Sequence, residues 1–146
     1  ASGVAEQFPN LRFGSVEAGI GWVPWALQAM DEAYLKHHWA VRPKMELLPS
    51  EYFKRQGFAT FQEDAAGLDL AISHDLVSNF MWANDYPHHE GSWPHSAEAI
   101  ERTMGELDDE SRAKILGLNA AEVFNIPIPD RYLDHEDARA SASRIA

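Results

Sequence analysis

The sequence contains no cysteine and is poor in basic side chains. Without cysteine, a disulfide framework, a thiolate metal site and a cysteine nucleophile are all excluded. Lys and Arg number 12 against 23 acidic residues, which gives a formal charge of −11. This balance argues against a nucleic-acid partner and against a basic helix on a membrane surface. His, Asp and Glu remain as the candidate chemical groups.

Long hydrophobic runs are also missing from the sequence. No apolar stretch reaches the roughly 18–20 residues of a membrane span, and no cationic segment followed by an apolar one opens the chain. Together with the lack of cysteine, these features predict a cytoplasmic protein without a membrane partner. The 146 residues are 45% hydrophobic, which is enough for one sizeable core.

Three short apolar runs predict buried β-strands with helices between them. The strands are expected at residues 11–16, 57–61 and 79–83. Apolar residues at helical spacing from Trp22 to Tyr34 predict a helix after the first strand, and an Ala-rich segment at 64–72 predicts another after the second. Such alternation predicts an α/β fold with parallel strands and right-handed crossovers.

Helical signals continue after the third strand. One helix is expected at 97–107, and a second at 108–117, where acidic residues stand at the start and glycine at the end. Asn119, with Glu122 three residues later, is interpreted as the cap of a final short turn. The segment 127–146 has two prolines, many charges and Ala/Ser repeats, so we expect an arm or a disordered tail there.

Polar residues that follow the first and third strands are the candidates for chemistry, because functional residues of parallel α/β folds gather at the carboxyl ends of strands. Asp85 can ligate a metal or take a proton from a metal-bound water, or it can accept backbone N–H bonds in its turn. Glu17 has either a catalytic or polar-pocket role or a structural one. The Gly-x-Gly at 19–21 lets a ligand or another backbone approach closely, and it is a weak phosphate signal.

Histidines and tryptophans near the strand ends are further candidates. His88, His89 and His95 lie close together, and neutral imidazole suits zinc. Adjacent histidines of an extended segment point to opposite sides, so we do not expect His88 and His89 to bind one ion. Loop histidines that hydrogen-bond or line a pocket are the favoured interpretation. Trp22 and Trp93 stand where they can face an aromatic substrate.

Three segments resemble, in order, the later part of one known family. Residues 8–25, 80–88 and 114–124 are similar to amidohydrolase-related metal-dependent hydrolases, in the branch of aminocarboxymuconate-semialdehyde decarboxylase and the aromatic-acid decarboxylases. The resemblance implies a (β/α)₈ TIM barrel, of which residues 1–126 would form the C-terminal portion, strands six to eight with their helices. A complete barrel takes about 250 residues, so we expect a remaining N-terminal part as partner.

The resemblance also implies one divalent metal ion at the C-terminal rim of the barrel, zinc first and manganese as the alternative. On this match Asp85 is the strand-eight aspartate, which binds the metal and handles the proton of its water. The other ligands of the family come from strands one and five, which have no counterpart here. Relatives suggest a homodimer, to which the tail would contribute.

The residues after the first strand bear on the reaction. The decarboxylase branch has a His-Gly-Gly-Gly-type segment with a catalytic histidine at this place, where this sequence has Val-Glu-Ala-Gly at 16–19. We therefore expect a metal-dependent hydrolase of a small aromatic carboxylated substrate, with catalytic Asp85 and Glu17. The substrate-binding residues expected around them are Trp22, His88 and Trp93.

Two alternatives to hydrolysis remain open. One is a non-oxidative, metal-dependent decarboxylase of the same family. The other is a non-catalytic module, or a barrel fragment that needs another chain, because one aspartate does not hold zinc at its usual four-coordinate site.

Overall fold

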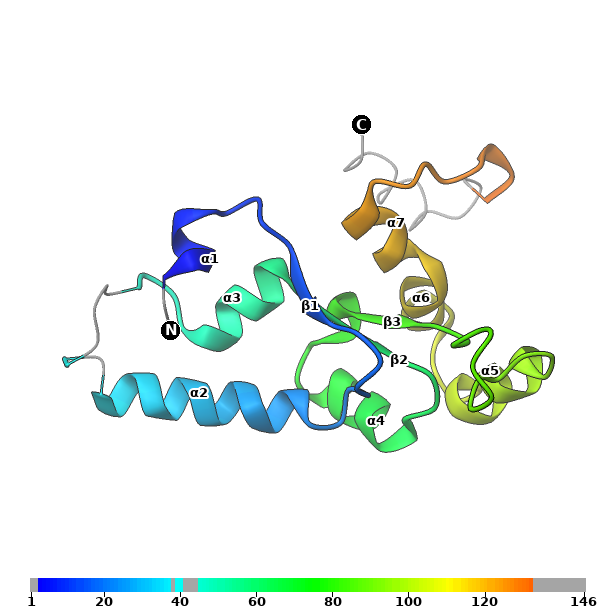
Figure 1. The fold of residues 1–146 in the computed structure, drawn as a ribbon, viewed down its shortest axis with the longest axis horizontal. Helices are drawn as coiled ribbons and strands as arrows, with labels where there is room; N and C mark the ends of the chain where they lie inside the picture. Colours follow the sequence, from blue (N-terminus) through cyan, green and yellow to red (C-terminus); the bar gives the residue numbers. More distant parts are fainter. Residues whose placement is uncertain (1–2, 38, 41–44, 133–146) are drawn as a thin grey trace.

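The centre of the fold is a parallel sheet of three strands (Figure 1). The computed structural model describes residues 3–37, 39–40 and 45–132. The strands lie in the order β1-β2-β3 and comprise β1 (Phe13–Ser15), β2 (Gly57–Phe61) and β3 (Phe80–Trp82). Phe13 pairs with Gly57, and Ala59 pairs with Phe80. The predicted α/β class and parallel strands are confirmed, and β1 and β3 are shorter than predicted.

Helices connect the strands and cover the sheet (Figure 1). The elements that precede β3 are α1 (Val4–Gln7), α2 (Val23–His37), α3 (Pro49–Gln56), α4 (Ala65–Ser73) and the 3₁₀ turn η1 (Val77–Asn79). Helix α2 is the predicted amphipathic helix, and Pro24 lies in its first turn, where its missing N–H costs no helical hydrogen bond. Helix α3 was not among the predicted helices. Its start is marked by Pro49 and by Glu51, which accepts the N–H of Leu48 (2.7 Å).

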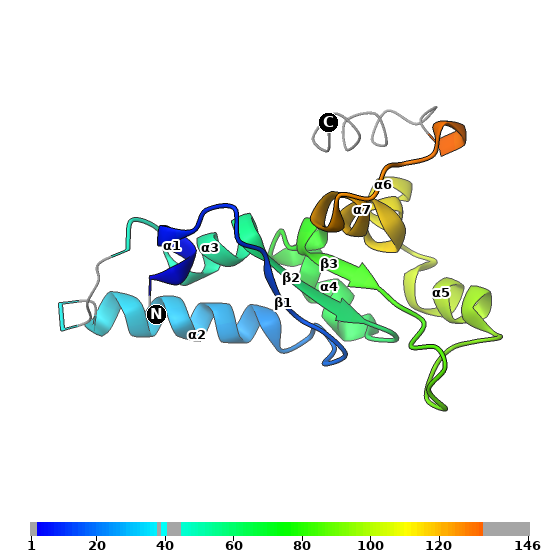
Figure 2. The same cartoon turned by 45° about the horizontal axis from the view of Figure 1, so that its top comes forward.

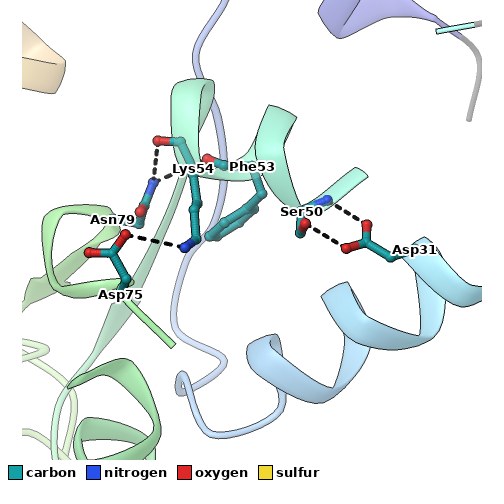
Figure 3. Close-up of polar contacts among 6 residues, drawn as sticks. All are labelled: Asp31, Ser50, Phe53, Lys54, Asp75 and Asn79. Atoms are coloured by element: carbon teal, nitrogen blue, oxygen red, sulfur yellow. Dashed lines mark hydrogen bonds and ion pairs between the residues drawn. The ribbon is translucent and has the colours of Figure 1, made fainter. Parts of the chain in front are cut away.

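Buried Asn79 fastens α3 to the sheet. Its Nδ2 atom donates to the carbonyl oxygens of Phe53 (3.1 Å), Lys54 (3.0 Å) and Gly57 (2.8 Å), and the side chain is drawn in Figure 3. These carbonyls belong to the last turn of α3 and the first residue of β2, where helical hydrogen bonding ends. The amide therefore fixes how the chain passes from α3 into β2.

Two further contacts hold α3 in place (Figure 3). Asp31 of α2 accepts from both the N–H (2.8 Å) and the hydroxyl (2.6 Å) of Ser50. Lys54 donates to the carboxylate of Asp75 at 3.3 Å, a pair that is largely solvent-exposed. The buried polar contacts, rather than this ion pair, account for the packing of α3, because exposed ion pairs are worth little.

Helices and helical turns make up most of the described chain after β3. Its elements are α5 (Ser96–Met104), α6 (Asp109–Ala113), the π-helical turn η2 (Lys114–Leu118), α7 (Asn119–Phe124) and the 3₁₀ turn η3 (Asp130–Tyr132). The predicted helix end at Gly117 is wrong, because the backbone runs through this residue into α7. Burial of Ile115 (1% exposed) holds that turn in place, and one helical glycine costs only about 1 kcal/mol.

Asn119 does not cap a turn as predicted. It lies inside the continuous helix, and its Nδ2 atom donates to the carbonyl oxygens of Val77 (2.8 Å) and Phe80 (2.7 Å). A helix that is continuous at this point has no free N–H groups to cap, so the amide is available to hold the helix against η1 and β3.

The hydrophobic core fills the space between one face of the sheet and the helices. Along β2 the residues alternate between buried and half-buried, as in a strand with one covered face. The buried core residues are Ile20, Val23, Leu27, Phe53, Ala59, Phe61, Leu68, Ala71, Leu76, Phe80, Met104 and Ile115. Large apolar side chains on and directly after edge strand β1 stay exposed, among them Phe13 (40%) and Val16 (65%).

The predictions of a C-terminal arm and of no membrane span can be compared only with the described residues. The predicted arm over 127–146 includes the turn η3, and its residues 133–146 lie outside the part that the structure describes. Within the described part of the chain, none of the helices has the length and apolar character needed to cross a membrane.

Candidate functional site

The loops after β1 and β3 bring three of the predicted site residues together. Glu17 follows β1 by two residues, and Asp85 follows β3 by three. One ligand atom each of Glu17, Asp85 and His88 lies within 4.8 Å of the other two. Figure 2 shows why loops so far apart in sequence meet: the strands are parallel, so their carboxyl ends share one edge of the sheet. We call these three residues the rim cluster.

Glu17 is held by its backbone and leaves its carboxylate free. Its φ of 62° lies in the left-handed region, which non-glycine residues seldom adopt. The N–H of Glu17 donates to Oγ1 of Thr60 on β2 at 3.0 Å. This bond ties the first loop to the central strand, and the side chain itself is exposed.

Asp85 lies in the second loop with a similar backbone conformation, at a φ of 57°. The turn around it is closed by Oδ1 of Asn84, which accepts the N–H of Tyr86 at 3.2 Å, and by the carbonyl of Asp85, which accepts the N–H of His88 at 2.9 Å. No described residue donates a hydrogen bond to the half-buried carboxylate of Asp85. One interpretation of Asp85 was that its carboxylate accepts backbone N–H bonds in this turn. In the structure, Asn84 accepts the N–H of Tyr86.

A cavity of about 300 Å³ lies beside Glu17 and Asp85. Its lining residues are Val16, Glu17, Gly19, Thr60, Phe61, Gln62, Glu63, Ala83, Asp85 and Glu90. Four of these carry carboxylates, and none is Lys or Arg. The nearby guanidinium of Arg102 forms an ion pair with Glu63. The cavity is therefore strongly acidic.

Asp64, which the sequence analysis did not single out, organises the first loop. Its Oδ2 atom accepts the N–H groups of Ile20 and Gly21, both at 2.8 Å, and its Oδ1 atom accepts that of Gly67 at 2.9 Å as the N-cap of α4. The close approach predicted at Gly19–Gly21 is thus made by a carboxylate of the chain itself. These N–H groups are no longer available to a phosphate. A capping position before a helix was the signal that pointed to Asp64.

The predicted aromatic residues lie away from this cavity lining. Trp22 donates from Nε1 to the carbonyls of Ala18 (3.2 Å) and Gly19 (3.1 Å), and its ring is 47% exposed. Trp93 packs edge-on against Tyr86 with ring centroids 5.4 Å apart. It lines an adjoining cavity of about 230 Å³, which shares Gln62, Glu63 and Glu90 with the acidic one. Neither tryptophan lines the acidic cavity, so the structure does not bring the predicted aromatic pair to the cluster.

The neighbouring histidines differ from His88. Nε2 of His89 lies 3.6 Å from Glu90, and Nδ1 of His95 lies 3.8 Å from Glu98. His88 alone of the three belongs to the rim cluster among the described residues.

The rim cluster fits a divalent metal ion. Two carboxylates and an imidazole are ligand types that zinc and manganese accept, at about 2.0–2.2 Å from the ion. Ligand atoms on one ion are then at most about 4.4 Å apart, which is close to the 4.8 Å spread of the cluster. Side chains at a solvent-exposed rim can close this difference by rotation.

Comparisons with known proteins show the family and the fold of the chain. A family model described as amidohydrolase matches residues 1–126. The structure of 5-carboxyvanillate decarboxylase from Sphingomonas paucimobilis is similar, with a TM-score of 0.70 and 28% identity, over 86% of this chain and 37% of that one. A dihydroxybenzoic acid decarboxylase from Polaromonas sp. JS666, solved with manganese and the inhibitor 2-nitroresorcinol, has a TM-score of 0.62 and 22% identity, over 94% and 38%.

No curated protein matches the chain. The chain spans little more than a third of the length of the two solved structures. The second structure, at 22% identity, shows the similarity of the fold alone. The family model covers 126 of the 146 residues. The chain therefore belongs to the amidohydrolase family.

Proposed function

We propose that these residues form the C-terminal portion, strands six to eight, of a (β/α)₈ barrel enzyme. Three observations support this proposal: the coverage of 37–38% of the neighbours, the parallel order β1-β2-β3, and the apolar side chains exposed beside β1. In the described residues β1 and β3 each pair on one side, and exposed strand edges favour further pairing. The proposed partner is the remaining N-terminal part of the barrel.

The proposed activity is metal-dependent chemistry on a small aromatic carboxylated substrate. The observation that carries it is the rim cluster at the carboxyl edge of the sheet, where barrel enzymes of this kind place their active sites. Asp85 would hold the metal and accept a proton. Bound there, a divalent ion supplies Lewis acidity toward a substrate oxygen. Glu17 and His88 would position the substrate or a water beside Asp85.

Decarboxylation is supported at least as well as hydrolysis. The neighbour with 28% identity is a decarboxylase of an aromatic acid, and 5-carboxyvanillate and related aromatic acids are therefore the first substrates to test. For decarboxylation, a side chain must deliver a proton to the ring carbon, and the imidazole of His88 is the cluster's candidate for this step.

Hydrolysis has one feature of this site in its favour. The resemblance places either Glu17 or Ala18 at the position of a catalytic histidine. With Glu17 in the cluster, two carboxylates can accept the proton of an attacking water. For hydrolysis we expect zinc rather than manganese as the metal. The neighbour from Polaromonas was solved with manganese. A cytoplasmic location and a homodimer stay predictions.

The test uses a protein in which these 146 residues stand together with the other strands of the barrel. Metal content is measured first, and aromatic carboxylates are then assayed for released CO₂, alongside esters and amides of similar shape for hydrolysis. We expect one bound divalent ion and CO₂ release, both lost in Asp85→Asn. Glu90→Gln, which removes another carboxylate of the same cavity, serves as the control. A metal-free, inactive protein would favour a non-catalytic module.

A further inference from the structure

We propose that the amino edge of the sheet, where the three strands begin, holds a binding site for phosphate formed by Arg12, Lys54 and Arg55. The proposal goes beyond the proposed function and does not depend on it, because the rim cluster lies at the opposite edge of the sheet. A cavity of about 160 Å³ lies at the amino edge. Its lining residues are Arg12, Lys54, Arg55, Gln56, Gly57, Ser78, Asn79, Asn119, Glu122 and Val123.

The parallel strands explain why residues so far apart in sequence line one cavity. Arg12 directly precedes β1, Gln56 ends α3 directly before β2, and Asn79 directly precedes β3. The amino ends of parallel strands share one edge of the sheet, as their carboxyl ends share the other (Figure 2). Figure 3 shows two of the lining residues, Lys54 and Asn79, joined by a hydrogen bond of 3.0 Å from Nδ2 of Asn79 to the carbonyl of Lys54.

The guanidinium groups of Arg12 and Arg55 have no acidic partner in the described chain. The other described Lys and Arg side chains each form an ion pair with a carboxylate: Lys36, Lys54, Arg102, Arg112 and Lys114. Arg12 instead donates to the carbonyl of Arg55 at 2.8 Å. Arg55 donates to Oε1 of Gln56, from Nε (3.2 Å) and Nη2 (2.8 Å), and to the carbonyl of Ala5 (3.0 Å). Both groups therefore keep a positive charge that no described carboxylate offsets.

These two guanidinium groups are held in place and still have donors to spare. A guanidinium carries five N–H groups. Arg12 uses Nη1 alone, and Arg55 leaves both N–H groups of its Nη1 atom unused in the described chain. The guanidinium of Arg55 also lies over the ring of Tyr52, 5.0 Å from its centroid. Donors that are positioned before the anion arrives lower the entropic cost of binding it.

Three buried amides give the cavity a rigid frame. Gln56 is 1% exposed and donates from Nε2 to the carbonyls of Phe8 (2.7 Å) and Leu11 (3.0 Å), which ties the segment before β1 to α3. Asn79 holds the first carbonyl of β2, and Asn119 holds the first carbonyl of β3. The starts of all three strands are therefore fixed around the cavity.

Charge and size favour phosphate over other anions. Three cationic side chains line the cavity against one carboxylate, that of Glu122, and Asp75, the partner of Lys54, is not in the lining. This excess matches the higher charge of phosphate better than the single charge of a carboxylate. Arginine forks suit phosphate oxygens, and lysine adds a point charge. The volume is below the roughly 300–1,000 Å³ of ordinary ligand pockets, so it suits one phosphate rather than an aromatic substrate.

The experiment measures binding of inorganic phosphate by isothermal titration calorimetry at fixed ionic strength. The protein is the complete barrel that tests the proposed function. Wild type is compared with Arg12→Gln and Arg55→Gln, each of which removes one guanidinium, and with Arg12→Lys, which keeps the charge and removes the fork. Circular dichroism checks the fold of every variant. Arg12 is exposed, so its two variants decide the question if Arg55→Gln unfolds.

We expect one phosphate per chain and a loss of affinity of about tenfold or more in both glutamine variants, as for the loss of a charge-assisted hydrogen bond. The affinity of Arg12→Lys should lie between those of Arg12→Gln and wild type. Glu122→Gln removes the one carboxylate of the lining and should bind phosphate more tightly. Arg112→Gln is the matched control and should bind like wild type, because Arg112 is paired with Glu101 and does not line the cavity.

Asp85→Asn separates this site from the proposed metal site. Phosphate held by a metal ion at the rim cluster would be lost in this variant, whereas phosphate at the amino edge should bind as in wild type. If only Asp85→Asn weakens binding, phosphate sits at the rim and the proposal for the amino edge is wrong. An inactive barrel that still binds phosphate through Arg12 would contradict the proposed function and leave this site in place.

Three further outcomes would overturn the proposal. Wild type that binds no phosphate, or glutamine variants of Arg12 and Arg55 that bind like wild type, would show that the cavity is not an anion site. An equal loss in Arg112→Gln would show a diffuse attraction. Binding by the 146-residue chain that disappears in the complete barrel would show that an acidic side chain of the other strands, rather than phosphate, occupies the cavity.

Discussion

Asp64 and Asp85 each follow a strand by three residues, and they have opposite surroundings. Asp64 comes after β2, which ends at Phe61, and Asp85 comes after β3, which ends at Trp82. The carboxylate of Asp64 accepts three backbone N–H groups, from Ile20, Gly21 and Gly67. That of Asp85 accepts none from the described residues and lies within the rim cluster.

The difference arises from what each loop offers nearby. In the β1–α2 loop, the N–H groups of Ile20 and Gly21 donate to the carboxylate of Asp64. These hydrogen bonds hold the two loops together. Beside Asp85 the turn is closed by Asn84, and the nearest polar groups are the side chains of Glu17 and His88. A carboxylate that is already saturated with donors stabilises a fold, whereas an unsaturated one is available for a ligand.

The largest expected effect separates the two aspartates by activity. In the complete barrel, Asp85→Asn should lower kcat/KM for the aromatic acid by about 10³-fold, because it removes a metal ligand and a proton acceptor together. Steady-state assays with CO₂ detection measure this loss. Unchanged activity in Asp85→Asn would contradict a functional role of Asp85 and with it the contrast with Asp64.

The second prediction reverses the roles and concerns stability. Asp64→Ala should lower the free energy of unfolding by about 2–4 kcal/mol, because it removes a helix cap and leaves the N–H groups of the first loop without their acceptor. Asp85→Asn, which keeps a residue that tolerates the left-handed backbone at this position, should change it by less than about 0.5 kcal/mol. Urea unfolding measures both. Equal losses in the two variants would contradict the comparison.

A pair of glycine substitutions sharpens the comparison on the Asp64 side. A Cβ at Gly67 would lie 2.5 Å from Oδ2 of Asp64 and 2.6 Å from a side-chain atom of Ile20, whereas a Cβ at Gly117 meets nothing within 4 Å. Gly67→Ala should therefore destabilise by about 1–3 kcal/mol through overpacking. Gly117→Ala should stabilise by up to about 1 kcal/mol, as alanine does in helices. Thermal unfolding of both variants provides the measurement.

The smallest effect concerns Asp108, an exposed counterpart of Asp64. It caps α6 by accepting the N–H (2.8 Å) and the hydroxyl (2.7 Å) of Ser111, and these hydrogen bonds, that of the N–H first, lower the pKa of the carboxyl below its usual value of 3.8. Because the folded pKa is the lower one, the charged carboxylate stabilises the fold above the usual pKa. This contribution is lost as the pH falls through the folded pKa.

Asp108→Asn therefore reports on this charge. The Tm of wild type should slightly exceed that of the variant at neutral pH, and the two values should converge as the pH falls below the usual pKa of 3.8. Calorimetry across an acid series measures the difference. A gap that widens toward low pH would contradict the assigned direction.

Elements with a strong apolar pattern were predictable from the sequence. The bounds of β2 match the prediction, and α2 and α4 follow their apolar or Ala-rich segments. Helix α3 was missed because its eight residues are mostly polar, and only Tyr52, Phe53 and Gln56 face inward. The helix through Gly117 was cut short because a glycine is read as a stop, while burial of Ile115 on the neighbouring turn overrides that local preference.

The residues of the candidate site were predictable from the sequence, whereas the contacts among them were not. Glu17, Asp85 and His88 were candidates because they follow apolar strands, and the family was recognisable from motifs in their order. Asp85 was interpreted either as a metal ligand and base or as an acceptor of backbone N–H bonds in its turn. In the structure Asn84, rather than Asp85, accepts the N–H of Tyr86. The metal role of Asp85 stays a prediction, as do the substrate-binding roles of Trp22 and Trp93.

By itself, the sequence determined the parallel α/β arrangement, the acidic character and the family, since these depend on composition and on local patterns. The tertiary structure alone decided which strand-end aspartate is saturated and which is free. Residues 64 and 85 have the same side chain at the same distance from a strand. The position of Asp64 before a helix indicates its hydrogen bond with Gly67, and no local pattern indicates the other two. The physical reason lies in donors that come from a distant segment. The N–H groups of Ile20 and Gly21, 44 and 43 residues away from Asp64, saturate its carboxylate.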